Sequence, residues 1–252
     1  LNRSKWDIAS HPMNESTFAG SLANEEMGVP VVSPYLAFGK TYGKMTGMPV
    51  GLIQTSLGGS PMERWNPKDG DLYLNMVDKI HETGGRYAGV LWYQGCSDTN
   101  PGPAEKYLEH FREYVEATRK ELGYEIPFFT MQLNRQINGI NDECWGMVRD
   151  AQARAAKEIP GVSVLTTSNL SLCDGIHNTA QANVALGEKL AKQCAHVLNG
   201  KEEYQPPELV KVERADEAEK KSFQLEGSGI WLKLTCDHVK NCFLVYSAVG
   251  KD

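Results

Sequence analysis

The sequence lacks a long apolar run, and none of its runs approaches the ~18 consecutive residues of a membrane-spanning helix. It also lacks an excess of positive charge, because 26 Lys and Arg residues face 32 Asp and Glu residues, for a net charge of −6. A chain with this balance is not attracted to phosphate backbones or to anionic lipid surfaces. We therefore expect neither nucleic acid nor a membrane among its partners.

Paired cysteine motifs are absent too. The six cysteines are scattered through the chain, and no two of them form a Cys-x-x-Cys pair. This spacing indicates reduced thiols in a cytosol-like compartment rather than a disulfide framework or a zinc site. The cysteines are Cys96, Cys144, Cys173, Cys194, Cys236 and Cys242.

Short apolar runs alternate with longer amphipathic stretches over residues 33–200. The runs are apolar throughout, as in strands buried on both faces, and the stretches repeat their apolar positions about once per helical turn. Strand, loop and helix in this order predict a parallel sheet with helices on both faces. We expect strands at 49–55, 88–93, 127–133 and 162–166, a helix through 148–159, and helices that stop at Gly47, Gly84, Gly123 and Gly200.

The character of the sequence changes near Tyr204-Gln205-Pro206-Pro207. A lysine-rich and acidic stretch follows, and then two β-like runs, Ile230–Leu234 and Phe243–Tyr246, the first of which alternates as a small antiparallel piece does. We therefore expect an α/β domain over residues 1–203 and a linker with a partial β-rich appendage over residues 204–252.

Three loops far apart in the sequence carry polar or glycine-rich motifs. Gly58-Gly59, Gln94-Gly95 and the Asp174/His177 pair each follow an expected strand. Ligand sites of parallel sheets lie beyond the carboxyl ends of the strands, where such loops meet. We expect these loops to form one pocket.

Asp174-Gly175-Ile176-His177 is the motif with the clearest chemical use. A carboxylate three residues before a histidine on a loop can accept a hydrogen bond from the imidazole and stabilise the imidazolium, as a general base requires. The alternative is a helix start with an acidic cap, because acidic residues favour helix N-termini.

The other two loops offer groups that could hold an oxyanion. Gly58 and Gly59 free the backbone to approach a ligand, and the Gln94 side chain could aim its NH₂ group at the same point. The alternatives are a plain turn between strand and helix, and a loop glutamine that satisfies neighbouring carbonyls. With an Asp–His pair, these groups suit the attack of a serine on an ester.

Five blocks follow one another along the sequence: Pro49–Ile53 with Gly58-Gly59 and Trp65, Leu91–Gly95, Pro127–Phe129 with Gln132-Leu133, Trp145 with Val148–Gln152, and Asp174–His177 ahead of Leu186-Gly187. In these blocks and their order, the chain resembles the sialate O-acetylesterase family of the SGNH-hydrolase superfamily, which includes carbohydrate acetyl esterases. The resemblance covers roughly residues 30–207.

The resemblance implies a flavodoxin-like, three-layer α/β/α sandwich with a parallel sheet, and removal of acetyl groups from sugar hydroxyls without a metal or organic cofactor. His177 would be the general base and Asp174 its orienting partner. Gly59, or its neighbour Gly58, and Gln94 would be oxyanion donors. Ser60, Trp65, Gly95 and Cys96 would line the pocket for an acetylated carbohydrate.

The family's nucleophile is absent from the sequence. In the family a serine in a Gly-Gln-Ser-Asn-Met block lies on the first strand, upstream of the Gly-Gly block. This sequence opens with Leu1-Asn2-Arg3 and contains no such block. A sheet without a central strand exposes unpaired backbone, which is costly. We therefore expect that an upstream segment or a second chain supplies the strand and the serine, and that this chain alone does not turn over substrate.

A second departure lies in the Gln94-Gly95-Cys96-Ser97 block, where the family usually has Gln-Gly-Glu-Ser. Cys96 is either a replacement nucleophile or, as we favour, a buried thiol that acts as a small apolar side chain. Two other functions remain open: a catalytically inactive carbohydrate-binding or scaffold homologue, and a hydrolase of another ester or lipid on the same fold.

Overall fold

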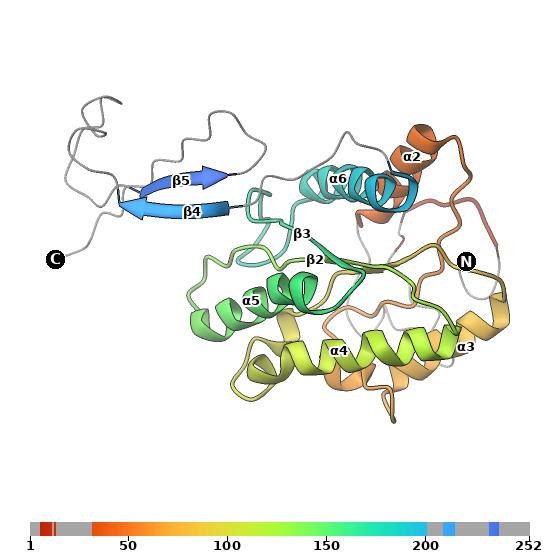
Figure 1. Ribbon diagram of the computed structural model, residues 1–252, viewed down its shortest axis with the longest axis horizontal. Coiled ribbons are helices and arrows are strands. Elements are labelled where there is room, and N and C mark those ends of the chain that lie inside the picture. The colour runs from red at the N-terminus through yellow and green to blue at the C-terminus, as the bar shows by residue number, and fades with distance from the viewer. Residues whose placement is uncertain (1–5, 12, 14–31, 201–208, 215–231, 237–252) are drawn as a thin grey trace. The chain divides into compact units, whose positions relative to one another are not determined.

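The computed structural model describes residues 6–11, 13, 32–200, 209–214 and 232–236 (Figure 1). The chain forms two compact units, Leu1–Lys201 and Glu202–Asp252. The expected Tyr204–Pro207 linker lies outside the described residues. The assignment of 1–203 as an SGNH-like domain and of 204–252 as an appendage stays a prediction.

A parallel sheet forms the middle of the first unit. Its strands β1 (Val90–Trp92), β2 (Phe128–Met131) and β3 (Val162–Leu165) lie in the order β1-β2-β3. Val90 pairs with Phe128, and Phe128 pairs with Val162, so all three strands point the same way. The expected parallel sheet is confirmed at these strands.

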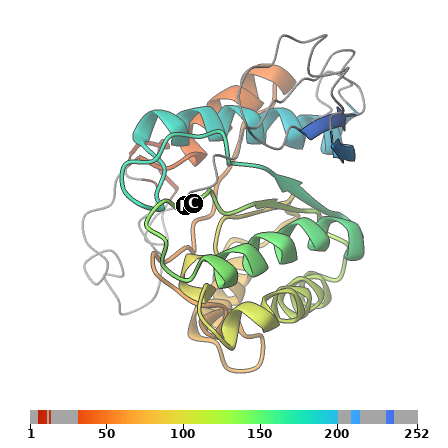
Figure 2. The same ribbon diagram turned by 90° about the vertical axis from the view of Figure 1, so that its left-hand side faces the viewer.

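Helices cover both faces of this sheet, as Figures 1 and 2 show. Helices α2 and α6 lie on one face, whereas α3, α4 and α5 lie on the other. The three-layer α/β/α arrangement is therefore confirmed. The helices are α2 (Tyr35–Thr46), α3 (Asp71–Thr83), α4 (Pro103–Leu122), α5 (Asp142–Glu158) and α6 (Ala180–Asn199), with short 3-10 turns η1 (Met62–Trp65) and η2 (Cys96–Asp98).

Close approach between α2 and α6 depends on Gly187. A Cβ atom built at Gly187 would lie 2.1 Å from the Pro34 carbonyl oxygen and 2.9 Å from the Phe38 nitrogen. No side chain fits in that space, so glycine lets the two helix backbones meet directly.

Aromatic side chains form the core between the sheet and helices α3–α5. The ring centroids of Trp92 and Tyr114 lie 4.5 Å apart, and those of Trp65 and Trp92 lie 5.1 Å apart in an edge-to-face pair. Such pairs add to the apolar area that the rings bury. Strand β1 is thereby anchored to helix α4 and to the turn η1.

The strand expected at 49–55 is wrong. None of these residues belongs to a strand in the part of the chain that the structure describes, and Leu52 and Ile53 are half-buried rather than buried on both faces. Within the described residues, β1 pairs with β2 on one edge, and no strand pairs with its other edge. A cavity of about 630 Å³ is lined by both 50–55 and 88–94. We call it the strand-edge cavity.

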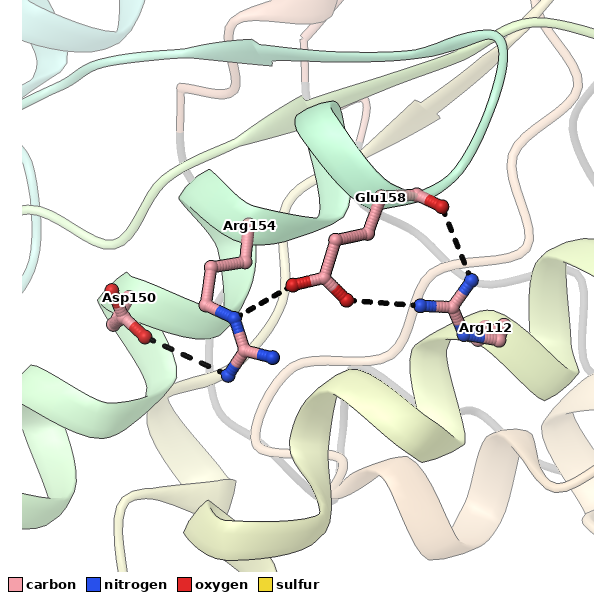
Figure 3. Close-up of polar contacts among 4 residues, drawn as sticks. All are labelled: Arg112, Asp150, Arg154 and Glu158. Atoms are coloured by element: carbon pink, nitrogen blue, oxygen red, sulfur yellow. Dashed lines mark hydrogen bonds and ion pairs between the residues drawn. The ribbon is translucent and has the colours of Figure 1, made fainter.

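Exposed ion pairs join α4 and α5 on their outer surface (Figure 3). Glu158 accepts from Arg154 at 2.8 Å and from Arg112 at 3.2 Å, and Asp150 lies 3.9 Å from Arg154. Each charge in this group is at least one-third exposed, so we expect a small contribution to stability.

The described residues offer neither a membrane-spanning helix nor a cluster of metal ligands. No helix among them has the length and apolar character to cross a membrane. In the same part of the chain, no group of three His, Cys, Asp or Glu side chains is arranged to hold a metal ion.

The second unit contains an antiparallel pair, β4 (Leu209–Arg214) and β5 (Leu232–Cys236). Strand β5 overlaps the expected run at 230–234, whereas β4 was not expected. The run at 243–246 lies outside the described residues.

Candidate active site

The structure brings the three predicted loops to the same edge of the sheet. Because the strands are parallel, the segments after β1, β2 and β3 all leave from their carboxyl ends. The Gln94 amide nitrogen donates to the Ser60 carbonyl oxygen at 2.9 Å, which joins the loop after β1 to the Gly58–Ser60 turn. Asn178 donates to the Tyr93 hydroxyl at 3.1 Å, which joins the His177 loop to the end of β1.

Asp174 holds His177 through both its carboxylate oxygens. Oδ2 lies 2.7 Å from His177 Nδ1, and Oδ1 accepts from the backbone N–H groups of Ile176 and His177 at 2.8 and 2.7 Å. The carboxylate therefore sets both the turn of the loop and the direction of the ring. Nε2 is left as the ring nitrogen that faces away from Asp174.

The environment of Asp174 favours its charged form. The His177 backbone N–H, with further hydrogen bonds from the loop, lowers the Asp174 pKa to about 2 despite some burial. The pair is open to solvent, since 64% of the His177 side chain and 52% of the Asp174 side chain are exposed. Asp174 is no helix cap, because Thr179 caps α6 by accepting from the Ala182 N–H at 3.1 Å.

The Gly58-Gly59 turn is exposed, and Gly59 has a φ of +66°, which favours glycine. Ser60, directly after it, is buried and donates to the Leu57 carbonyl at 2.8 Å. Trp65 in turn donates its ring N–H to the Ser60 hydroxyl at 3.0 Å and lies in the aromatic core. Ser60 and Trp65 therefore brace the turn, whereas the glycines form its open side.

The Gln94 amide group is held by two acceptors. Its nitrogen donates to the Ser60 carbonyl and, at 2.5 Å, to an Asp98 carboxylate oxygen. Asp98 is 3% exposed and also accepts from the Met62 backbone N–H at 3.0 Å; burial raises its pKa. An oxyanion would have to displace one of the two acceptors to receive a Gln94 hydrogen.

Gly95 and Cys96 lie against helix α5. Gly95 has a φ of +141°, and a Cβ atom there would lie 3.1 Å from the Gln152 amide nitrogen. Burial raises the pKa of the Cys96 thiol to about 11, so almost none of it is thiolate at neutral pH. Cys96 is half-buried rather than buried, and its raised pKa makes it a poor nucleophile.

Three buried amide side chains, those of Asn134, Gln152 and Asn178, brace the carboxyl edge of the sheet. The sequence analysis assigned no role to them. Asn134 donates to Asn178 Oδ1 at 2.7 Å and to the Leu170 carbonyl at 3.2 Å. Gln152 accepts from the Leu133 N–H at 2.8 Å and donates to the Gln94 carbonyl at 2.9 Å. The sequence pattern indicated them only weakly, because one is a polar residue just after a strand and another lies within the apolar face of a helix.

A three-layer α/β/α fold with an Asp–His pair beyond its carboxyl edge is that of an SGNH-type hydrolase. A family model described as carbohydrate esterase, sialic acid-specific acetylesterase, matches residues 1–196. The chain belongs to this family, and the resemblance found in its motifs is confirmed.

Individual relatives agree with the family. An Arabidopsis thaliana protein named as a probable carbohydrate esterase is 27% identical over 197 residues, which cover 75% of this chain and 70% of that protein. An X-ray structure of an Arabidopsis thaliana protein matches with a TM-score of 0.66 and 26% identity over 77% of this chain and 78% of that one.

Two further structures share the fold. A carbohydrate acetylesterase from Xanthomonas citri has a TM-score of 0.62 and 25% identity, and the match covers 71% of this chain and 44% of that one. NanS has a TM-score of 0.56 over 75% of this chain and 77% of its own, and at 12% identity it supports the fold alone.

Proposed function

We propose that the protein is a carbohydrate O-acetylesterase that removes acetyl groups from sugar hydroxyls by serine-type acyl transfer. The observation that carries the proposal is the 2.7 Å contact between His177 Nδ1 and Asp174, which leaves the other ring nitrogen open on the edge where three loops meet. Its substrate would be an acetylated carbohydrate, as the name of the family indicates.

Each group has a role in this proposal. His177 takes the proton from the attacking hydroxyl and returns it to the leaving sugar oxygen, while Asp174 orients the ring and stabilises its charged form. The exposed backbone of Gly59, with Gly58, supplies oxyanion donors. Gln94 joins them when its amide exchanges the Ser60 carbonyl for the oxyanion.

The nucleophile is proposed to come from polypeptide outside the present sequence, either an upstream segment or a second chain. The strand-edge cavity supports this, because it lies along the edge of β1 that no described strand pairs with. An extended segment that pairs parallel to β1 there would add a strand, and its carboxyl end would then reach the same edge as His177. Cys96 is a poor substitute, given its raised pKa.

A catalytically inactive carbohydrate-binding homologue is the second candidate. It is favoured by one observation, the Gln94-Gly95-Cys96-Ser97 block in place of the family's Gln-Gly-Glu-Ser. Such a protein would keep the pocket and bind an acetylated sugar without hydrolysing it.

The coding sequence upstream of Leu1 separates the two candidates. An in-frame Gly-Gln-Ser block favours the enzyme. The product of the complete coding sequence should then release acetate from O-acetylated sugars and hydrolyse p-nitrophenyl acetate. His177→Ala should lower both rates by about 10²–10⁴-fold. Equal rates for the wild type and His177→Ala would overturn the role of His177. Sugar binding without acetate release would support the inactive homologue.

A further inference from the structure

The carboxylate of Asp98 lies where two of the loops at the carboxyl edge meet. Asp98 is 3% exposed and ends the turn η2, which follows the loop that carries Gln94. Its two oxygens accept from the Met62 backbone N–H at 3.0 and 3.1 Å, and one of them accepts from the Gln94 amide at 2.5 Å. Met62 begins η1 shortly after Ser60, so one carboxylate ties the Gly58–Ser60 turn to the Gln94 loop.

A carboxylate at this depth is costly to keep. Burial disfavours its charged form and raises its pKa, although hydrogen bonds from Gln94 and Met62 oppose this, and His110 favours the charged form through space. A neutral acceptor would be cheaper to bury than a charged one. What sets the carboxylate apart is that, when ionised, it only accepts hydrogen bonds and therefore faces N–H groups and not carbonyl oxygens.

The two acceptors of the Gln94 nitrogen decide which way the amide faces. That nitrogen donates to the Ser60 carbonyl at 2.9 Å and to Asp98, whereas the Gln94 Oε1 atom is buried and has no hydrogen-bond partner among the described residues. If the amide turned over, Oε1 would meet the carbonyl and the carboxylate, and three oxygens would face one another. The charged acceptor makes the larger difference between the two orientations.

The nitrogen is the end of the amide that the proposed reaction requires, because N–H groups stabilise an oxyanion and a carbonyl oxygen repels it. The backbone of Gln94 is held separately, since its carbonyl accepts from Gln152 at 2.9 Å and from the Tyr107 hydroxyl at 3.1 Å. The freedom that remains lies in the side chain. When the oxyanion takes the hydrogen that is now given to Ser60, Asp98 keeps the other one.

We propose that Asp98 is a positioning residue of the esterase. It holds the Gln94 amide with its nitrogen towards the oxyanion, and through Met62 it holds the Gly58–Ser60 turn beside that amide. Its effect on the reaction rate rests on the proposed function, whereas the orientation of the amide does not.

Steady-state kinetics of the product of the complete coding sequence test the effect on rate. Asp98→Asn keeps the shape of the side chain but puts an NH₂ group beside the Met62 or the Gln94 donor. We expect kcat for acetate release from an O-acetylated sugar to fall about tenfold with KM nearly unchanged, because the weakened contact acts in the transition state. Gln94→Ala should lower kcat by about 10²-fold, and adding Asp98→Asn to it should cause little further loss.

A merely structural role of Asp98 would give a different result, because its loss would then add to that of Gln94→Ala. Asp71→Asn is the matched control: it makes the same chemical change in a carboxylate that pairs with Arg64 of η1 at 2.6 Å. It should leave kcat unchanged. Additive losses in the double variant, or an equal loss in Asp71→Asn and Asp98→Asn, would overturn the proposal.

NMR of protein labelled at its glutamine side chains tests the orientation without catalysis. The signals that disappear in Gln94→Ala identify the Gln94 amide. In the wild type, we expect an NH₂ group that is bound to a carboxylate to resonate downfield of exposed glutamine amides and to exchange slowly with water. Asp98→Asn should move these signals towards the exposed ones. Wild-type Gln94 signals like those of exposed glutamines would overturn the contact, even if Asp98→Asn does not fold.

The two proposals fail in different ways. If His177→Ala loses acetate release while Asp98→Asn keeps the wild-type kcat, the esterase stands and the positioning role of Asp98 falls. If the wild type releases no acetate from any O-acetylated sugar, the esterase falls together with the effect of Asp98 on rate. A downfield Gln94 signal that is lost in Asp98→Asn would still establish the orienting contact.

Discussion

The outer surface of α4 and α5 and the carboxyl edge of the sheet use charged and polar groups in opposite ways. On the surface, Arg112 and Arg154 are matched by Glu158 within the chain. At the edge, Arg135 and Arg149 bind only carbonyl or hydroxyl groups among the described residues, and His177 keeps one ring nitrogen away from its aspartate. The surface charges are matched within the chain, whereas the second ring nitrogen of His177 takes the proton of the attacking hydroxyl in the proposed reaction.

The sharpest way to test this contrast is to remove His177. In the product of the complete coding sequence, His177→Ala should lower kcat/KM for an O-acetylated sugar by about 10²–10⁴-fold, because the general base is lost. Arg112→Ala, on the paired surface, should leave kcat/KM unchanged. Initial-rate assays of acetate release measure both variants, and a comparable loss in the two would contradict the contrast.

A second test concerns the buried amides that brace the edge. Gln152→Leu keeps a similar volume but leaves the Leu133 N–H without its partner. It also removes one of two donors to the Gln94 carbonyl, which keeps the Tyr107 hydroxyl. We expect the free energy of unfolding to fall by about 1–3 kcal/mol. Urea denaturation measures it, with Gln136→Leu, on the loop after β2, as a milder comparison. If Gln152→Leu lowers the free energy of unfolding less than Gln136→Leu does, the structural role of Gln152 is contradicted.

The ion pairs of Figure 3 should contribute less to stability than the hydrogen bonds of Gln152. Glu158→Gln removes the partner of both Arg112 and Arg154, yet we expect a change of less than ~1 kcal/mol in the free energy of unfolding, since these charges are exposed. The change should shrink further in high salt. Thermal unfolding at low and high salt measures it, and a large effect that salt does not alter would contradict the assignment.

The smallest expected effect is the response of Asp174 to acid. Its folded pKa, about 2, lies below the ordinary value of 3.8, so the folded state binds this proton less readily than the unfolded state. The stabilisation is therefore present above about pH 4 and is lost as the pH falls towards 2. The free energy of unfolding, measured against pH for the wild type and for Asp174→Asn, tests this expectation. If the two proteins lose stability equally as the pH falls from 4 towards 2, the expectation is contradicted.

The parallel sheet, most helix ends and the Asp–His contact could be predicted because each depends on local sequence. Gly47, Gly123 and Gly200 end their helices in the left-handed conformation, as expected for glycine at that position. Asp174 and His177 are three residues apart, so a single turn brings them together.

The predictions at 49–55 and at Gln94 depended on partners that lie far away in the sequence. An apolar run becomes a strand only where another strand pairs with it, and the described residues place a cavity there. The direction of the Gln94 amide follows from Asp98, whose burial local patterns do not reveal.

Gly187 has a consequence beyond the contact of two helices. Phe38 and Tyr42 of α2 and Cys194 and Leu198 of α6 also line the strand-edge cavity. A Cβ atom at position 187 would lie only 2.1 Å from the Pro34 oxygen, so even alanine there would push the two backbones apart. The single hydrogen atom of Gly187 therefore keeps the cavity-lining residues of both helices at their present separation.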